Sequence, residues 1–149
     1  MAACATSGAS GPCDASHAAD AATGLAFLGR LEADPNVHIT VNVDGGSVVG
    51  VNRFGSGVIQ IGRGWRGLAE NQYTLSGVVA HEVYEEGLFQ LAGTTRYLSP
   101  GLIYSAHPDA VRYGEDPSYA GVGLATRTSR SCNGDVGRAP APFGGKPIC

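Results

Sequence analysis

The chain has 149 residues, of which 43% are hydrophobic and 15% charged, a composition typical of one compact domain and not of a disordered segment. Its formal net charge of −3 does not favour the basic surface that nucleic-acid binders use, so we expect no nucleic-acid partner. The longest apolar runs fall short of the ~18 residues of a membrane-spanning helix, so we expect no membrane association.

The amino-terminal end predicts a flexible arm. Residues 1–13 are small and polar, without the basic and apolar regions of a secretory signal peptide, so we expect a cytosolic protein or a domain exported within a larger one. The cysteines suit one or two disulfides or four reduced thiols, and their spacing does not choose among the three pairings. They lie near the two ends of the chain: Cys4, Cys13, Cys132 and Cys149.

An alanine-rich segment predicts the first helix. Asp14 and Ser16 are helix-capping residue types at its start, the helix is expected to end near Glu32, and Asp34-Pro35 stops it. Apolar residues recur every three or four positions and predict one buried face. They are Ala18, Ala21, Leu25, Leu28 and Leu31.

Three short strands are expected next. Residues 37–43 alternate apolar and polar side chains, which predicts a strand with one buried face. The turn residues 44–46 lead into a return strand ending at residue 52, and residues 58–61 form a third strand after the turn at 55–57. Consecutive strands with tight turns favour an antiparallel meander, with a mixed sheet as the alternative.

A second helix is expected from Thr74, a capping residue type, to about Leu91, with Gly93 beyond it. Apolar residues occur almost all the way round this helix, which is typical of a buried one. Four chemistry-bearing residues nevertheless share one arc: His81, Glu82, Glu85 and Glu86. Burying carboxylates without partners costs several kcal/mol each, and a bound cation would compensate them.

The spacing within this arc points to a metal ion. His81 and Glu85 are four residues apart and therefore neighbours on one helical face, where an imidazole and a carboxylate could ligate one ion. Glu82 lies beside them and could accept a proton from a metal-bound water. Histidine with carboxylate favours Zn²⁺, with Mn²⁺, Fe²⁺ and Ni²⁺ as alternatives.

The remaining chain is less regular. His107-Pro108 predicts the entry to a short helix ending at Gly114, and residues 117–149 are rich in glycine and proline and predict a mostly irregular tail. The expected organisation is one domain, with an arm (1–13), a core (14–116) and a tail (117–149).

The strand at 58–61, the following loop and the helix with Val-Val-Ala-His81-Glu82 together resemble the core of zincin metallopeptidases over about residues 15–116. In that family an HExxH helix lies beneath a mixed sheet whose edge strand, here 58–61, holds the peptide substrate. Glu85 stands where the family has its second histidine, giving HExxE. The resemblance implies an α+β fold with a zincin-like core and a zinc-dependent peptidase or amide hydrolase. His81 and Glu85 would be metal ligands and Glu82 the general base.

A third ligand must come from downstream of the motif. His107 is the first choice because it is the only histidine after the motif, and Glu115 is the alternative because some zincins use a glutamate from a later helix. Asp109 and Asp116 are weaker candidates. Position alone suggests three side chains for stabilising an oxyanion: Tyr104, Arg112 and Tyr113.

A small zincin without a signal peptide resembles the toxin or effector domains of larger secreted bacterial proteins. That resemblance implies delivery within such a protein, a protein or peptide substrate, and a cognate inhibitor or immunity protein.

Three other interpretations are a degenerate metallopeptidase fold acting as a binding module, a solvated or arginine-paired face formed by Glu82, Glu85 and Glu86, and a glycosidase-type pair of Glu82 and Glu86. Trp65 either lines a substrate cleft or covers the edge of the core.

Overall fold

The computed structural model describes residues 15–43, 50–52, 55–62, 74–93 and 106–122. The fold is α+β, as the sequence predicts. Residues 106–109 are α-helical and lead directly into the π-helix η3. In chain order the elements are α2 (Ala15–Ala33), β1 (Thr40–Val43), β2 (Gly50–Asn52), β3 (Val58–Ile61), α3 (Leu75–Leu91), η3 (Ala110–Glu115) and α5 (Asp116–Ala120).

The sheet is mixed, with β3 in its centre. Strand β1 pairs with β3 in parallel, from Thr40 opposite Val58 onward, and β2 pairs with β3 antiparallel. The predicted meander is therefore wrong, because β1 pairs with β3 and not with β2. The expectation that residues 58–61 form an edge strand is wrong for the same reason. Ile59 and Ile61 are 0% exposed, because the face of β3 on which they lie packs against Val78 of α3.

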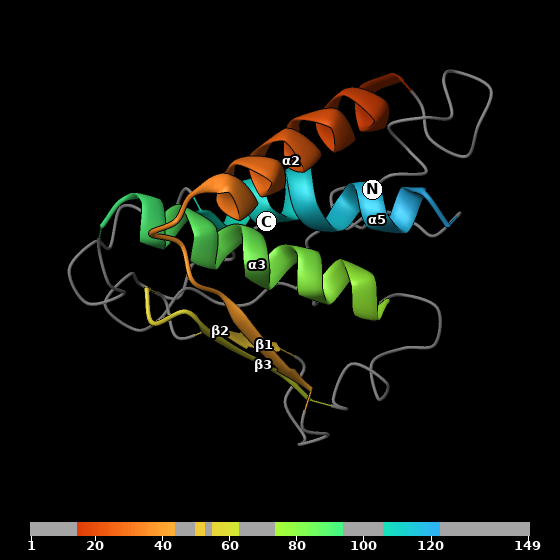
Figure 1. Ribbon diagram of the computed structural model, residues 1–149. Helices are drawn as coiled ribbons and strands as arrows, with labels where there is room; N and C mark the ends of the chain where they lie inside the picture. The colour runs from red at the N-terminus through yellow and green to blue at the C-terminus, as the bar shows by residue number, and fades with distance from the viewer. Residues whose placement is uncertain (1–14, 44–49, 53–54, 63–73, 94–105, 123–149) are drawn as a thin grey trace, which may run out of the picture.

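Helix α3 is the central layer of the molecule. Figure 1 shows it between the sheet on one side and α2 on the other, with η3 and α5 beside the two helices. It packs against β2 and β3 as well as against all three helical neighbours. This placement explains why its sequence is apolar nearly all the way round. Val78 packs with Ile59 and Ile61 on the sheet side, and Tyr84 packs with Phe27 and other residues on the helix side.

The first helix is confirmed, with one change in its buried face. Helix α2 buries Ala21 and Leu31 as expected, but Leu25 is 37% exposed. Phe27 is buried instead, because its ring lies 4.2 Å from the ring of Tyr84 on α3. An aromatic contact between two helices therefore sets the rotation of α2.

The ends of α3 are also confirmed. The Thr74 side chain accepts a hydrogen bond of 3.0 Å from the Gly77 backbone N–H, which satisfies one of the amides left open at the helix start. The helix ends at Leu91, and Gly93 adopts a φ of +62°, a conformation that glycine reaches without strain.

Two glycines let the carboxy-terminal helical segment approach α3 closely. A Cβ on Gly77 would lie 2.5 Å from a ring carbon of Tyr119, and one on Gly114 would lie 3.0 Å from the Ala80 carbonyl oxygen. Any larger residue would push η3 and α5 away from α3. The glycines thus bring Glu115 and Tyr119 next to the first turns of α3.

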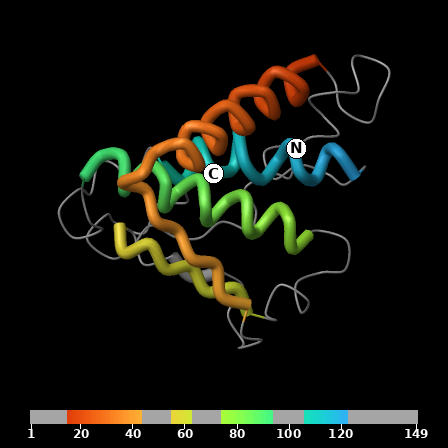
Figure 2. Tube along the Cα trace, in the orientation of Figure 1, coloured from red at the N-terminus to blue at the C-terminus, as the bar shows by residue number. Residues whose placement is uncertain are grey.

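Helix α5 follows η3 without a break. Residues 116–120 are helical and buried, so the packed part of the chain extends at least to Ala120. Figure 2 shows the helical stretch that ends with α5 beside α2 and α3. No helix among the described residues is long and apolar enough to cross a membrane. The predictions for the arm, the cysteines, Trp65, Tyr104 and residues 123–149 fall outside the described residues.

Candidate metal centre

Three side chains that the sequence predicts as ligands come together beside α3. His81 and Glu85 lie one turn apart on that helix, and His107 comes from the helical turn before η3. One ligand atom from each of the three lies within 4.8 Å of the others. Glu85 Oε1 is 3.3 Å from His81 Nε2 and 2.7 Å from His107 Nδ1. This His81–Glu85–His107 group could hold a metal ion.

The group is buried on its helix side and more open at His107. The side chains of His81 and Glu85 are 8% and 6% exposed, whereas that of His107 is 18% exposed. His107 Nε2 is buried and has no hydrogen-bond partner in the described part of the chain. Buried polar atoms in folded proteins are almost always paired, so this nitrogen marks a place that suits an ion or a water.

The charges of the group depend on one another. Burial opposes the charged form of His81, but its hydrogen bonds and charge interactions with Glu115 and Glu85 outweigh burial and raise the pKa of His81 to about 10. Burial also favours the neutral form of Glu85, yet the hydrogen bonds from His107 and His81 lower its pKa to about 2. In the metal-free protein His81 is therefore a cation beside a carboxylate, and a metal ion would replace a proton there.

A second carboxylate contacts the opposite edge of the His81 ring. His81 Nδ1 lies 2.9 Å from Glu115 Oε2, and the Tyr119 hydroxyl donates a hydrogen bond of 2.6 Å to Glu115 Oε1. The two nitrogens of an imidazole lie on different edges of the ring, so Glu115 and Glu85 face His81 from opposite sides. Glu115, the alternative third ligand, therefore contacts His81 away from the His81–Glu85–His107 group.

Glu86, the next residue after Glu85, has a structural role. Its side chain is 0% exposed and accepts hydrogen bonds from the backbone N–H groups of Gly55, at 2.8 Å, and Gly57, at 2.6 Å. The interpretation of this cluster as a solvated or arginine-paired face is wrong for Glu85 and Glu86, because both are buried and pair with histidines or backbone amides. The glycosidase-type pair is also unsupported, since both Glu86 oxygens are engaged in holding the turn before β3.

Other predicted site residues lie elsewhere or outside the group. Glu82 follows His81 on α3 and is half-buried. The Arg112 side chain donates to Asp20 of α2 at 3.2 Å, and Tyr113 packs against the cluster that contains Phe27 and Leu31, so both contribute to the contact between η3 and α2. Asp109 and Asp116 are not members of the one candidate ligand group found among the described residues.

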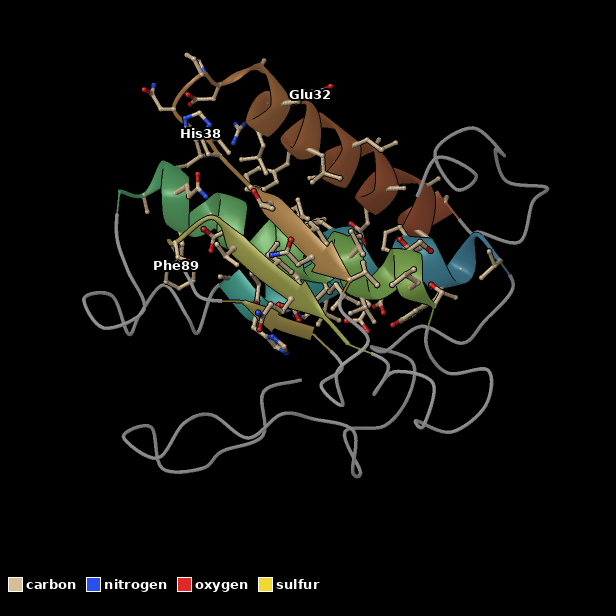
Figure 3. The ribbon with its side chains drawn as sticks, turned by 60° about the horizontal axis from the view of Figure 1, so that its bottom comes forward. Glu32, His38 and Phe89 are labelled. Carbon is tan, nitrogen blue, oxygen red and sulfur yellow. The ribbon has the colours of Figure 1, made fainter. Side chains whose placement is uncertain are left out.

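An open pocket lies at the other end of α3 and contains none of these ligands. Figure 3 labels two of its lining residues, His38 in the connection between α2 and β1 and Phe89 near the end of α3. Gln90, which also lines it, uses its side chain to bond the backbone N–H and carbonyl of His38. The titratable cluster at His81 and this pocket are therefore separate features of the molecule.

Comparison with known proteins found no matching family model, no matching curated protein and no matching solved structure. The function must therefore be argued from the residues themselves. Sequence reasoning found the three candidate ligands but missed the pairing of Glu115 with Tyr119. The available signal was their spacing of four residues, which a helix continuing past Gly114 would have placed on one face.

Proposed function

We propose that this chain is a zinc-dependent peptidase or amide hydrolase built on a zincin-like core. The His81–Glu85–His107 group carries the proposal, because two imidazoles and one carboxylate within 4.8 Å are a donor set suited to zinc. Three protein ligands also leave a fourth position open, which distinguishes catalytic from structural zinc sites. The greater exposure of His107, 18% against 8% and 6% for the side chains of His81 and Glu85, supports an open side at His107.

In the proposed reaction the zinc ion and the protein side chains have different roles. Zinc, when bound, would supply a Lewis acid that polarises an amide carbonyl and lowers the pKa of water. Glu82 would take the proton from the attacking water and return it to the leaving nitrogen as the amide bond breaks. Glu82 is half-buried on α3, next to His81 in the sequence. Glu85 and the two histidines would hold the ion, and Glu86 would keep α3 docked on the sheet.

The substrate and the setting follow from the zincin resemblance. We infer a protein or peptide substrate, delivery as a toxin or effector domain of a larger secreted bacterial protein, and a cognate immunity protein. Inhibition of growth on expression in bacteria, relieved by Glu82→Gln, would support this. Equal inhibition by the Glu82→Gln variant would contradict a hydrolytic toxin.

Metal content is the first test. The native protein and His81→Ala should be purified without nickel affinity steps, loaded with zinc, dialysed and measured by mass spectrometry. About one zinc per native chain, lost in the variant, is expected. Glu32→Gln, which changes an exposed carboxylate on α2, is the matched control and should keep its zinc. No zinc in the native protein after loading would overturn the proposal.

Hydrolysis is the second test. The zinc-loaded native protein should cleave members of a mixed peptide library, and Glu82→Gln should lose cleavage while it keeps the metal and the folded state. Cleavage at the native rate by Glu82→Gln would exclude Glu82 as the general base.

One observation favours a second candidate, a non-catalytic binding module. Glu85 already pairs with both histidines in the metal-free protein, so the cluster can act as a buried ion network that holds α3 to the segment at 106–120. A native protein that keeps its thermal stability in a chelator, binds no zinc and cleaves no peptide would support this function over the first.

A further inference from the structure

A series of hydrogen bonds links Tyr119 of α5, Glu115 of η3 and His81 of α3. The Tyr119 hydroxyl donates to Glu115 Oε1 at 2.6 Å, and Glu115 Oε2 lies 2.9 Å from His81 Nδ1. Tyr119 is 0% exposed and Glu115 is 2% exposed. A buried carboxylate that is hydrogen-bonded at both oxygens has one fixed orientation. The fixed Glu115 carboxylate can therefore hold the His81 ring in one orientation.

These hydrogen bonds have a defined chemical consequence for His81. A carboxylate only accepts hydrogen bonds, so the contact with Glu115 requires a proton on Nδ1. A neutral imidazole with its proton on Nδ1 presents a lone pair at Nε2. Nε2 is the nitrogen that faces Glu85, at 3.3 Å, within the His81–Glu85–His107 group. Glu115 therefore selects the tautomer whose free nitrogen points toward the candidate ion.

The packing around these hydrogen bonds leaves little room for another arrangement. Gly77 has no side chain where Tyr119 lies, since a Cβ there would be 2.5 Å from the tyrosine ring. The Ser118 hydroxyl donates to the Gly114 carbonyl at 3.0 Å, which ties α5 to η3. These contacts fix Tyr119 and Glu115 against the first turns of α3.

We propose that Glu115 is a positioning residue of the metal centre, which holds His81 with Nδ1 protonated and Nε2 available to the ion, and that Tyr119 orients Glu115. This inference rests on the proposed zinc site. Carboxylates that contact a ligand histidine in this way contribute roughly 10- to 100-fold to metal affinity. Glu115 thus acts beyond the ligand shell, and the ion is held by His81, Glu85 and His107.

Zinc affinity in two conservative variants tests the proposal. Zinc dissociation constants are measured by competition with a chromophoric chelator. Glu115→Gln, which keeps the shape but removes the charge, should weaken zinc binding roughly 10- to 100-fold. Tyr119→Phe, which removes one hydroxyl, should weaken it about 3- to 10-fold. Glu32→Gln is the control, because it makes the same change at an exposed carboxylate of α2, and its zinc affinity should stay within about twofold of native.

Long-range proton–nitrogen NMR of the zinc-loaded protein gives a readout that a merely structural role would not move. His81 should carry its proton on Nδ1, and this proton should shift upfield in Glu115→Gln because its acceptor is no longer charged. Zinc bound through Nδ1, or unchanged affinity and His81 signals in Glu115→Gln, would overturn the inference and leave the zinc site standing. A native protein that binds no zinc would overturn the proposed function and this inference together. If Glu115→Gln fails to fold, the zinc affinity of Tyr119→Phe tests the inference alone. An affinity equal to that of the native protein would then refute the proposed role of the Tyr119–Glu115–His81 hydrogen bonds.

Discussion

Replacing Glu86 with alanine should destabilise the fold more than any single change at the protein surface. The carboxylate is 0% exposed, and it accepts hydrogen bonds from the buried N–H of Gly57, the partly buried N–H of Gly55 and the Gln90 side chain. Glu86→Ala leaves the two backbone donors without their acceptor, and each buried orphan costs about 1–3 kcal/mol. Since Gly55 can recover part of its hydration, we expect a loss of about 3–4 kcal/mol in the free energy of unfolding.

Urea unfolding followed by circular dichroism measures this loss. With a slope of about 2 kcal/mol per molar urea, the midpoint should fall by about 1.5–2 M. Glu32→Ala, an exposed change on α2, should alter the free energy of unfolding by less than about 0.5 kcal/mol. Glu86→Gln should lie between the two, because its amide oxygen can still accept from one glycine while its NH₂ faces the other donor. A loss below about 1 kcal/mol for Glu86→Ala would refute the reasoning that this carboxylate holds the turn before β3.

Three further predictions concern the metal centre and its supports. Gly114→Ala places a Cβ 3.0 Å from the Ala80 carbonyl oxygen, so η3 should move away from α3. The zinc affinity, measured by calorimetric titration, should therefore fall. An unchanged affinity would mean that the metal site does not need this close approach of the two helices. In chelator, the raised pKa of His81, about 10 against an ordinary 6.5, means that its ion pairs stabilise the fold fully below pH 6.5 and progressively less as the pH rises toward 10. The difference in the free energy of unfolding between the native protein and His81→Ala should shrink across that window, and a difference constant with pH would contradict the assignment. Zinc at 100 times its dissociation constant should add about 2.7 kcal/mol to the free energy of unfolding. This gain, seen as a higher melting temperature, should disappear in His107→Ala, and a gain of native size there would exclude His107 as a ligand.

The helices could be predicted from residues close together in the sequence, whereas the pairing of the strands could not. Thr74 and Gly93 each indicate one end of α3 by the residue type at that position, and the structure has both ends there. The pairing of β1 with β3 joins segments separated by another strand, and nothing in either segment names its partner. The turn-type residues at positions 44–46 favour pairing of adjacent strands, but the structure has β3 between β1 and β2.

The same division applies to the candidate site. His81 and Glu85 are recognisable because helical spacing is a local rule, and His107 because it is the only histidine after the motif. The role of Glu115 depends on where η3 lies against α3, which in turn depends on the missing side chains of Gly77 and Gly114. Such contacts between distant segments leave no periodic pattern in the sequence.

The π-helix makes the length of the chain, and not only its side chains, a determinant of this site. The Asp116 backbone N–H bonds to the Val111 carbonyl, five residues back, whereas an α-helix would bond four residues back. Deleting one residue between 110 and 114 would let the segment close as an α-helix, and everything after it would rotate by about 100° relative to what precedes it. Glu115 would then turn away from His81 although every other residue of the site was intact. The hydrogen-bonding pattern of the six residues of η3 thus determines whether Glu115 can contact His81.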